Sequence, residues 1–328
     1  PLGVATDVRH LDPALAALSD TACERLVDRA GPLLPPLSVG FTRVRSATGA
    51  SVGVDIVGVP FTSAQVMAAL RAGRPQRIID RVHDAAMLAR VAGARVVGFG
   101  GHTSIVAQLD TTWSDDVAWV SGNALTAAAA AQVAREGALR RGLPLRIGVV
   151  GAAGSIGALL AELLAPDAEE VLLVGRPRSA VRLHSVAERV LGSVPWRIST
   201  ELADLATCSV IVTASNSPEP VVNATHVGRP ALVVDVAVPG DAHPELRGLA
   251  GVTVVRGGAV RLPGGQTLGI AGLDLGDGHV HACLAETLLC GLGALHDSAL
   301  VGSPSAARAA RLLELAHVHG FIVDEAPW

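Results

Sequence analysis

Hydrophobic positions in the first half of the chain follow a helical spacing in two places and a strand-like spacing in two others. Within residues 63–70 and 76–91, apolar side chains recur every three or four residues, which predicts two helices with one buried face each. Apolar runs at 94–98 and 117–120 predict strands, and the alanine-rich stretch 124–139 predicts a long helix. This alternation indicates a small α/β domain.

The segment before residue 40 is rich in proline and has no sustained periodicity beyond a helical stretch at about 14–30. Pro32, Pro35 and Pro36 end that stretch, because proline lacks the amide that a helix interior requires. We therefore expect an irregular N-terminal segment that packs on a neighbouring surface.

The pattern after Gly142 and Pro144 predicts a second α/β domain. A run of apolar strands separated by helical or loop connections is typical of a parallel sheet buried on both faces. The fold class is therefore α/β, a Rossmann-type doubly wound parallel sheet with a smaller N-terminal α/β domain and a C-terminal helical segment. The expected strands lie at 145–150, 171–174, 209–213, 231–236 and 252–255, and the expected last helices at 283–295 and 305–317.

Composition excludes several classes of protein. Hydrophobic residues make up 50% of the 328 positions, but no run approaches the roughly 18 apolar residues of a membrane-spanning helix, so we expect a soluble, cytoplasmic protein. A net charge of −4 without a basic cluster, and only eight aromatic residues, argue against nucleic acid as a partner. The chain contains neither Tyr nor Lys, which excludes any mechanism that needs a catalytic Tyr/Lys pair.

A glycine-rich turn directly follows the first strand of the second domain. Gly151, Gly154 and Gly157 occur at a three-residue spacing, and Ser155 and Ile156 begin the helix that follows. Such a turn lets the backbone approach a pyrophosphate, whose charge the free amides and the helix dipole stabilise. The strand before and the helix after favour a dinucleotide site over a simple tight turn.

The end of the next strand indicates which dinucleotide binds. A carboxylate that would bind the ribose hydroxyls of NAD is missing there, and Arg176 and Arg178 stand in its place. Planar guanidinium groups suit a 2′-phosphate, which predicts NADPH as the cofactor. Thr213, Ala214 and Ser215 end a later strand at the sheet edge where the nicotinamide is usually placed.

Cys283 is the cysteine best placed for chemistry. It follows His279 and His281 and precedes an apolar helical pattern, so it falls near a helix N-terminus. Positive charge there would favour the thiolate and make it a nucleophile. Cys290 looks like a packing residue, and the four cysteines show neither a disulfide framework nor a zinc pattern, so no metal is expected.

Several segments, taken in order, resemble the long-chain acyl-[acyl-carrier-protein] reductases, which form aldehydes. The resemblance covers about residues 60–295, and the cysteine motif comes last. It departs from the family at His102, where an apolar or aromatic residue is usual, before residue 63 and after residue 295. The matching segments are 81–92, 100–105, 121–127, 150–157, 233–239 and 282–286.

The resemblance implies a substrate-binding domain at 1–142, an NADPH-binding Rossmann domain at 143–258 and a C-terminal segment, 259–328, that carries the nucleophile Cys283. It also implies that the loop 100–104 helps to form the reaction pocket. The expected substrate is an acyl thioester on an acyl-carrier protein or coenzyme A, reduced to an aldehyde through an acyl group on Cys283.

The remaining roles stay open at this point. The Ser104 hydroxyl and the backbone amides that begin the Cys283 helix are candidate oxyanion donors. His281 is the candidate proton donor, with His102 and His279 as alternatives. Two other functions remain: an NADP-dependent dehydrogenase of the shikimate type without a covalent step, which usually needs a Lys, and an NADPH-binding sensor without turnover.

Overall fold

The computed structural model describes residues 2–4, 13–15, 17–190, 192, 194–217, 219–270, 272–295, 297–300, 302 and 304–326. By compactness the chain forms two units. Unit 1 contains residues 1–122, 261–302 and 315–321, and unit 2 contains residues 123–260, 303–314 and 322–328. The division into three consecutive functional parts stays a prediction, since the C-terminal part is shared between both units.

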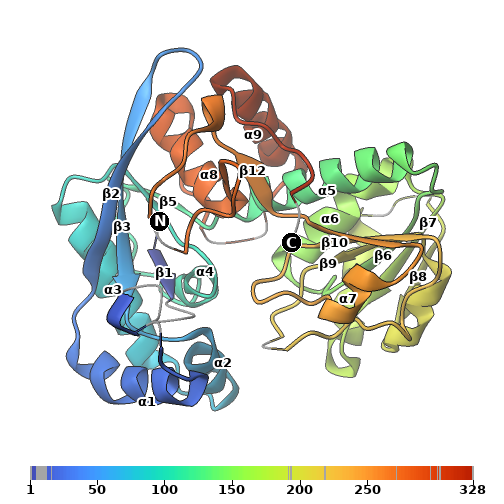
Figure 1. Cartoon of the computed structure of the whole chain (residues 1–328), viewed down its shortest axis with the longest axis horizontal. Helices are drawn as coiled ribbons and strands as arrows, with labels where there is room; N and C mark the ends of the chain where they lie inside the picture. The colour runs from blue at the N-terminus through green and yellow to red at the C-terminus, as the bar shows by residue number, and fades with distance from the viewer. Residues whose placement is uncertain are drawn as a thin grey trace. The chain divides into compact units, whose positions relative to one another are not determined.

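Unit 2 is built on six parallel strands in the order β11-β10-β9-β6-β7-β8 (Figure 1). The chain builds the sheet outward from β6 to β7 and β8, and then returns to the other side of β6 with β9, β10 and β11. This change of direction between β6 and β9 is the topology of a Rossmann fold. The fold class predicted from the hydrophobic runs is therefore confirmed. The strands are β6 (Arg146–Val150), β7 (Glu170–Val174), β8 (Trp196–Ser199), β9 (Val210–Thr213), β10 (Ala231–Asp235) and β11 (Val252–Arg256).

Alternate residues of these strands enter two different cores. Val149, Leu173 and Val212 pack beneath helices α5, α6 and α7, while Leu172 and Ile211 pack on the opposite face. That opposite face is covered by short 3-10 segments and loops, so both faces of the sheet are buried, as the apolar strands require. The helices are α5 (Asn123–Arg140), α6 (Ser155–Leu164) and α7 (Ala180–Val190), and the longer 3-10 segments are Leu202–Thr207 and Pro244–Gly248.

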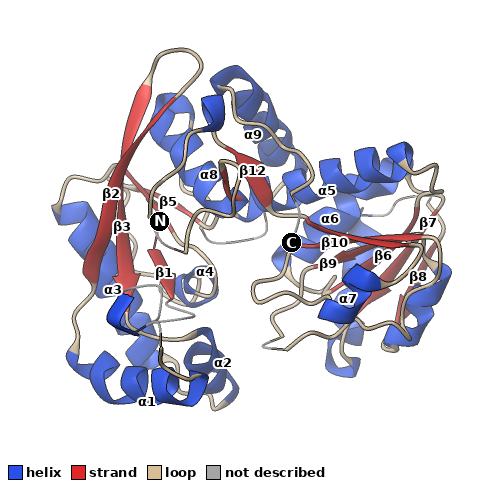
Figure 2. Ribbon diagram, viewed as in Figure 1, coloured by secondary structure: helices blue, strands red, loops and turns tan. Residues whose placement is uncertain are grey.

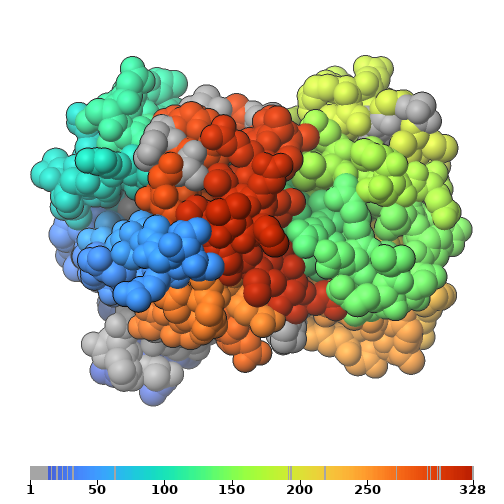
Figure 3. Space-filling model, turned by 90° about the horizontal axis from the view of Figure 1, so that it is seen from above, coloured from blue at the N-terminus to red at the C-terminus, as the bar shows by residue number. Residues whose placement is uncertain are grey.

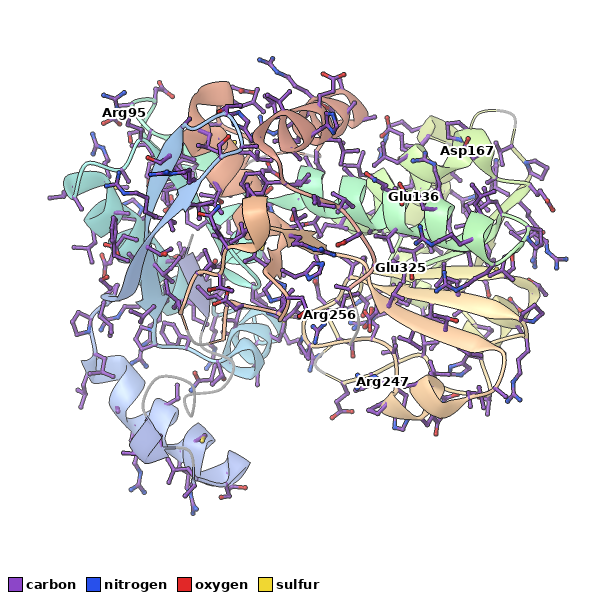
Figure 4. The ribbon with its side chains drawn as sticks, turned by 45° about the horizontal axis from the view of Figure 1, so that its top comes forward. Arg95, Glu136, Asp167, Arg247, Arg256 and Glu325 are labelled. Carbon is purple, nitrogen blue, oxygen red and sulfur yellow. The ribbon has the colours of Figure 1, made fainter. Side chains whose placement is uncertain are left out.

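The end of the chain is fastened to unit 2 by charge and backbone contacts. Glu325 accepts hydrogen bonds from Arg140 and Arg141 at 2.7 Å each, beside helix α5 (Figure 4). The Arg256 amide donates to the Ala326 carbonyl at 3.0 Å. The two guanidinium groups lower the pKa of Glu325, so this carboxylate keeps its charge.

Among the described residues, unit 1 contains two small sheets, the strand β13, which pairs with β12 (Ala259–Arg261), and several helices (Figure 2). β4 and β5 pair in parallel, and β1, β3 and β2 form a mixed three-stranded sheet. The strands are β1 (Leu2–Val4), β2 (Leu37–Arg45), β3 (Ser51–Val59), β4 (Val96–Gly98), β5 (Ala118–Val120) and β13 (His279–His281). The helices are α1 (Asp20–Ala30), α2 (Ser63–Arg71), α3 (Gln76–Val91), α4 (Thr103–Ala107) and α8 (Ala282–Leu289).

Two further elements, β12 (Ala259–Arg261) and α9 (Ala306–His319), contain residues of both units. The predicted helix at 283–295 ends earlier than expected, because a π-helical turn, Cys290–Ala294, follows α8. Among the described residues, no helix is both long enough and apolar enough to cross a membrane.

The β2–β3 hairpin was not predicted. The side chains of its nine-residue strands point alternately to the two faces of the hairpin. Most side chains of β2 are exposed or half-buried, so the sequence of this strand lacks a strong apolar pattern. The hairpin lies against the C-terminal part of unit 1 (blue beside orange and red in Figure 3). Gln266 makes hydrogen bonds to the backbone of Arg45 from both ends of its amide, and Ser46 lies 2.8 Å from the His319 ring.

Candidate functional site

The glycine turn of unit 2 has the geometry of a dinucleotide cradle. It follows β6, and α6 begins at Ser155 with Gly154 as its N-terminal cap. Gly151 has φ +79°, a left-handed conformation that favours glycine. A Cβ atom on Gly157 would overlap the Gly151 carbonyl, so the helix can approach the turn only because both positions lack side chains. The residues present therefore fit a pyrophosphate.

Arg176 and Arg178 lie where the second strand of the sheet ends. β7 stops at Val174, and both arginines are exposed in and beside the short turn Pro177–Ser179. No carboxylate lies between Val174 and Arg178. In this fold that position faces the ribose of the cofactor, so the arginines suit a 2′-phosphate.

Thr213, Ala214 and Ser215 leave the sheet next to the glycine turn. The Ala214 amide donates to the Val150 carbonyl at 3.0 Å, and a Cβ atom on Gly151 would lie 2.6 Å from the Ala214 carbonyl oxygen. The structure thus brings together the predicted residues Gly151, Ala214 and Ser215. It also adds two buried carboxyl groups, Asp235 and Asp241, that the sequence reasoning missed.

Asp235 ends the neighbouring strand β10, Asp241 lies in the loop after it, and both bind the segment 213–215. Asp235 accepts a hydrogen bond from the Thr213 hydroxyl at 2.8 Å, and Asp241 accepts two from Ser215. Burial raises the pKa of Asp235, and it raises the pKa of Asp241 to about 6. Two polar residues in an otherwise apolar stretch at 231–242 were the only sequence feature that could have found them.

Cys283 lies in unit 1, at the second position of α8, as the sequence predicted. Glycines allow this helix to lie close to the β4–β5 pair. A Cβ atom on Gly98 would overlap Thr287, and one on Gly122 would overlap Cys283 itself. Gly122 also has φ +73°, so both the contact and the backbone conformation favour glycine there.

The electrostatics of Cys283 differ from the expectation of a stabilised thiolate. The residue is half-buried, and burial raises the pKa of its thiol above the usual value. The backbone of Gly101 and of Leu284 lowers the pKa, whereas the Glu286 carboxylate raises it. The helix N-terminus is present, but desolvation outweighs it, so the thiol is protonated at neutral pH.

The other three cysteines are buried. Burial raises the pKa of Cys208 to about 11, and Cys290 is fully buried after the end of α8. Cys23 packs beside Val27 in a small cluster. Buried thiols of this kind act as small apolar side chains, which leaves Cys283 as the most accessible cysteine of the chain.

The polar residues predicted to assist Cys283 have different surroundings. The Ser104 hydroxyl donates to the Gly101 carbonyl at 2.8 Å, so it must rotate before it can serve an oxyanion. His281 is half-buried and precedes the first residue of α8. His279 is buried, with its Nδ1 atom 3.1 Å from the Gly276 carbonyl.

His102 is buried beside Gly101, and its Nε2 atom has no hydrogen-bond partner in the part of the chain that the structure describes. Burial lowers the pKa of His102, so its ring is neutral at pH 7. A buried imidazole nitrogen without a partner is costly, which suggests that a water molecule or a substrate group completes its hydrogen bonding.

Comparison with known proteins supports the reading of unit 2. The family model described as shikimate / quinate 5-dehydrogenase matches residues 140–256, which include all six strands of the parallel sheet. No curated protein matches the chain significantly. The family match therefore concerns the nucleotide-binding part, about a third of the sequence.

Similar solved structures include the nucleotide-binding domain of glutamyl-tRNA reductase from Thermoplasma volcanium, at 18% identity and a TM-score of 0.30, over 39% of this chain and 84% of that one. Iminosuccinate reductase from Paracoccus denitrificans, in complex with NAD⁺, matches at 25% identity and a TM-score of 0.28, over 35% of this chain and 36% of that one. Shikimate 5-dehydrogenase from Listeria monocytogenes, in complex with shikimate and NAD, matches at 12% identity and a TM-score of 0.31, over 52% of this chain and 63% of that one.

The last two proteins are thus matched over less than two thirds of their own length. TM-scores this low do not establish a common arrangement of the whole chain. The family match, the strand order and the glycine turn together identify an NAD(P)-binding Rossmann domain in unit 2.

Proposed function

We propose that the protein reduces an acyl thioester to an aldehyde with NADPH, through an acyl group held on Cys283. The observation that carries the proposal is the placement of this cysteine, half-buried at the start of α8 and in contact with a loop that turns at Gly122. Gly122 lies against the Cα and Cβ atoms of Cys283, so this glycine lets the start of α8 approach the loop, and the other three cysteines are buried. The ordered resemblance to acyl-[acyl-carrier-protein] reductases supports the same role.

The choice of NADPH is supported by the two exposed arginines, Arg176 and Arg178, at the end of β7. Gly151, Gly154 and Gly157 would hold the pyrophosphate, and Thr213, Ala214 and Ser215 would border the nicotinamide. When bound, NADPH supplies the hydride that converts the acyl group into an aldehyde.

In the first step the Cys283 sulfur, after losing its proton, attacks the thioester carbonyl carbon. The new carbon–sulfur bond forms as the bond to the carrier sulfur breaks, and the carrier thiolate takes up the proton that Cys283 lost. Backbone groups of Gly101 and Leu284 favour the thiolate despite burial. After reduction the hemithioacetal oxyanion collapses, its bond to the Cys283 sulfur breaks, and the aldehyde leaves the restored thiolate.

His102 and His281 are the candidates for carrying the proton between Cys283 and the carrier thiol. His102 is neutral, buried, and one residue from Gly101, whose backbone interacts with the thiol. A neutral imidazole can accept the thiol proton and return it to the leaving group. His281 lies two residues before Cys283 and stays the alternative.

The carrier could be an acyl-carrier protein or coenzyme A. Arg71, Arg74 and Arg77 are exposed around the turn between α2 and α3. A basic surface attracts an acidic carrier protein and the phosphates of coenzyme A alike, so these residues support docking of either.

A dehydrogenase of the shikimate type, which transfers hydride without a covalent step, is the second candidate. The family match over residues 140–256 favours it. The chain contains no Lys, the residue on which such a reaction usually depends. The presence or absence of an acyl-enzyme separates the two functions, and an NADPH-binding sensor would show binding without turnover.

Mixing the protein with a panel of acyl thioesters, with NADPH withheld, should give a mass increment equal to one acyl group. Intact mass spectrometry measures this increment. Cys283→Ala should abolish it, whereas Cys290→Ala, which changes a buried thiol just beyond the same helix, should keep it. An adduct that survives Cys283→Ala, or no adduct with any thioester, would refute the covalent step.

His102→Phe should stabilise the protein while slowing it. Removing a buried nitrogen that lacks a partner should raise the free energy of unfolding by about 1 kcal/mol, measured by urea denaturation. Loss of the proton carrier should lower kcat by roughly a hundredfold. If His281→Phe lowers kcat by that factor and His102→Phe does not, the proton passes through His281.

Arg176→Ala should raise KM for NADPH at least about tenfold and leave KM for NADH within about twofold, because the guanidinium would bind the 2′-phosphate that NADH lacks. Steady-state kinetics with both dinucleotides measure the two values. Arg189→Ala, on an exposed position in the last turn of α7, serves as the control and should change neither. An equal effect on both dinucleotides would contradict the assignment.

A further inference from the structure

Two buried carboxyl groups in unit 2 take no part in the proposed chemistry. Asp235 ends β10 and is 2% exposed, and Asp241 lies in the loop that follows and is fully buried. Buried carboxyl groups are costly unless hydrogen bonds satisfy them. Both carboxyl groups accept hydrogen bonds at the carboxyl edge of the parallel sheet, where the cofactor turn is found.

Asp241 holds Ser215 with both of its oxygens. Its Oδ2 atom accepts a hydrogen bond from the Ser215 amide at 2.8 Å, and its Oδ1 atom accepts one from the Ser215 hydroxyl at 2.5 Å. The Ser215 hydroxyl oxygen in turn accepts one from the Ser217 amide at 3.1 Å. The backbone and the side chain of Ser215 are therefore fixed by a single carboxyl group.

The loop that carries Asp241 is itself fixed. Asp235 accepts hydrogen bonds from the Ala237 amide at 3.1 Å and the Ala242 amide at 2.8 Å. The Asp241 carbonyl accepts from the amides of Val221 and Val222, at 2.8 and 2.9 Å. Asp241 is thus a rigid support, so Ser215 can move only if this support changes.

The position of Ser215 matters because the segment touches the glycine turn. A Cβ atom on Gly151 would lie 2.6 Å from the Ala214 carbonyl oxygen and 3.0 Å from the Cα atom of Ser215. A displacement of Ser215 by a fraction of that distance would change the space at the turn. Holding Ser215 therefore shapes the site that receives the dinucleotide.

We propose that Asp241 is a positioning residue for NADPH, which holds Ser215 against the glycine turn and takes up a proton as the cofactor binds. This inference rests on one part of the proposed function, the binding of NADPH, and it does not depend on the thioester substrate. It assigns a role to a residue that no step of the proposed reaction uses.

The charges around Asp241 explain why its carboxyl group would take up a proton when NADPH binds. Burial raises its pKa to about 6, the two hydrogen bonds from Ser215 lower it, Asp235 raises it and Arg176 lowers it. Arg256 ends β11 and pairs with Asp235 of β10; burial and the charge of Arg247 lower its pKa, and Asp235 raises it. A phosphate bound near Arg176 would offset the attraction of that guanidinium for ionised Asp241. The pKa of Asp241 would then rise, so a proton would bind together with the cofactor.

The sign of the pH dependence follows from this linkage. A ligand that raises the pKa of a group binds more tightly as the pH falls through that pKa. Wild-type affinity for NADPH should therefore rise between about pH 8 and about pH 5. Asn at position 241 resembles the protonated carboxyl, since its oxygen can accept from the Ser215 amide while its NH₂ group donates to the hydroxyl oxygen.

The test is the dissociation constant of NADPH, measured by direct titration over that pH range without thioester. Asp241→Ala should bind at least about tenfold more weakly at every pH, and Asp241→Asn should bind within about threefold of the wild type at low pH. The Asn variant should also lack part of the wild-type pH dependence. Calorimetry in two buffers of different ionisation enthalpy should show correspondingly fewer protons taken up.

Two further variants guard against a general loss of folding. Ser215→Ala removes only the hydroxyl contact and should weaken binding by about threefold. Ser209→Ala, at the opposite edge of the sheet, removes a buried hydroxyl that donates to the Pro144 carbonyl, and it should leave the affinity unchanged.

Wild-type affinity in Asp241→Ala and Ser215→Ala would overturn the positioning role, and an unchanged proton uptake in Asp241→Asn would overturn the coupling. A wild-type protein that bound neither NADPH nor NADH would instead contradict the proposed function itself.

Discussion

The register of the parallel strands in unit 2 is the constraint on which the cofactor site depends. Val150 pairs with Val174 and with Thr213, and Thr213 pairs with Asp235, so four strands end level with one another. Parallel strands that end together present their following loops at one edge. Because both faces of the sheet are buried, a slip of one residue would move each side chain of that strand from one core into the other and disrupt the packing of both. The cores thereby fix the positions of the loops.

Close backbone approach at glycines is the second recurring feature. In unit 2 the helix α6 reaches the turn after β6 because Gly151 and Gly157 leave room for each other. In unit 1 the helix that carries Cys283 packs on the β4–β5 pair through Gly98 and Gly122. This packing places the thiol beside a polar loop. The same packing removes the thiol from water, and this desolvation raises the pKa of Cys283 above its usual value. A raised pKa requires a base near the thiol, and His102 and His281 are the two proposed candidates for it.

Much of the architecture could be predicted from local pattern. The strands around 145–150 and 209–213, the helix at 76–91 and the helix start at Cys283 were predicted to within a few residues, because an apolar period or a glycine turn marks each. The strand Trp196–Ser199 and the β2–β3 hairpin were missed, since short or half-exposed strands leave a weak pattern.

The parts of the site that escaped prediction depend on contacts between distant residues. Asp241 meets Ser215 across 26 positions of sequence, and only the pairing of β9 with β10 brings them together. The direction of the Cys283 pKa could not be read from its helix position either, because the residue is desolvated in the fold, where Gly101 and Gly122, far away in the chain, lie against it. Spacing along the sequence indicates candidate reactive residues, whereas packing in the fold determines their pKa values and protonation states.

In the proposed reaction, the acyl group bound to Cys283 is reduced to an aldehyde. The most direct measurement is a single turnover, in which the acylated protein is separated from excess thioester and then mixed with NADPH. The account predicts one equivalent of aldehyde and one equivalent of oxidised cofactor for each acyl group lost from Cys283. Release of the group as a carboxylic acid, with NADPH unchanged, would contradict it, as would aldehyde formation by Cys283→Ala.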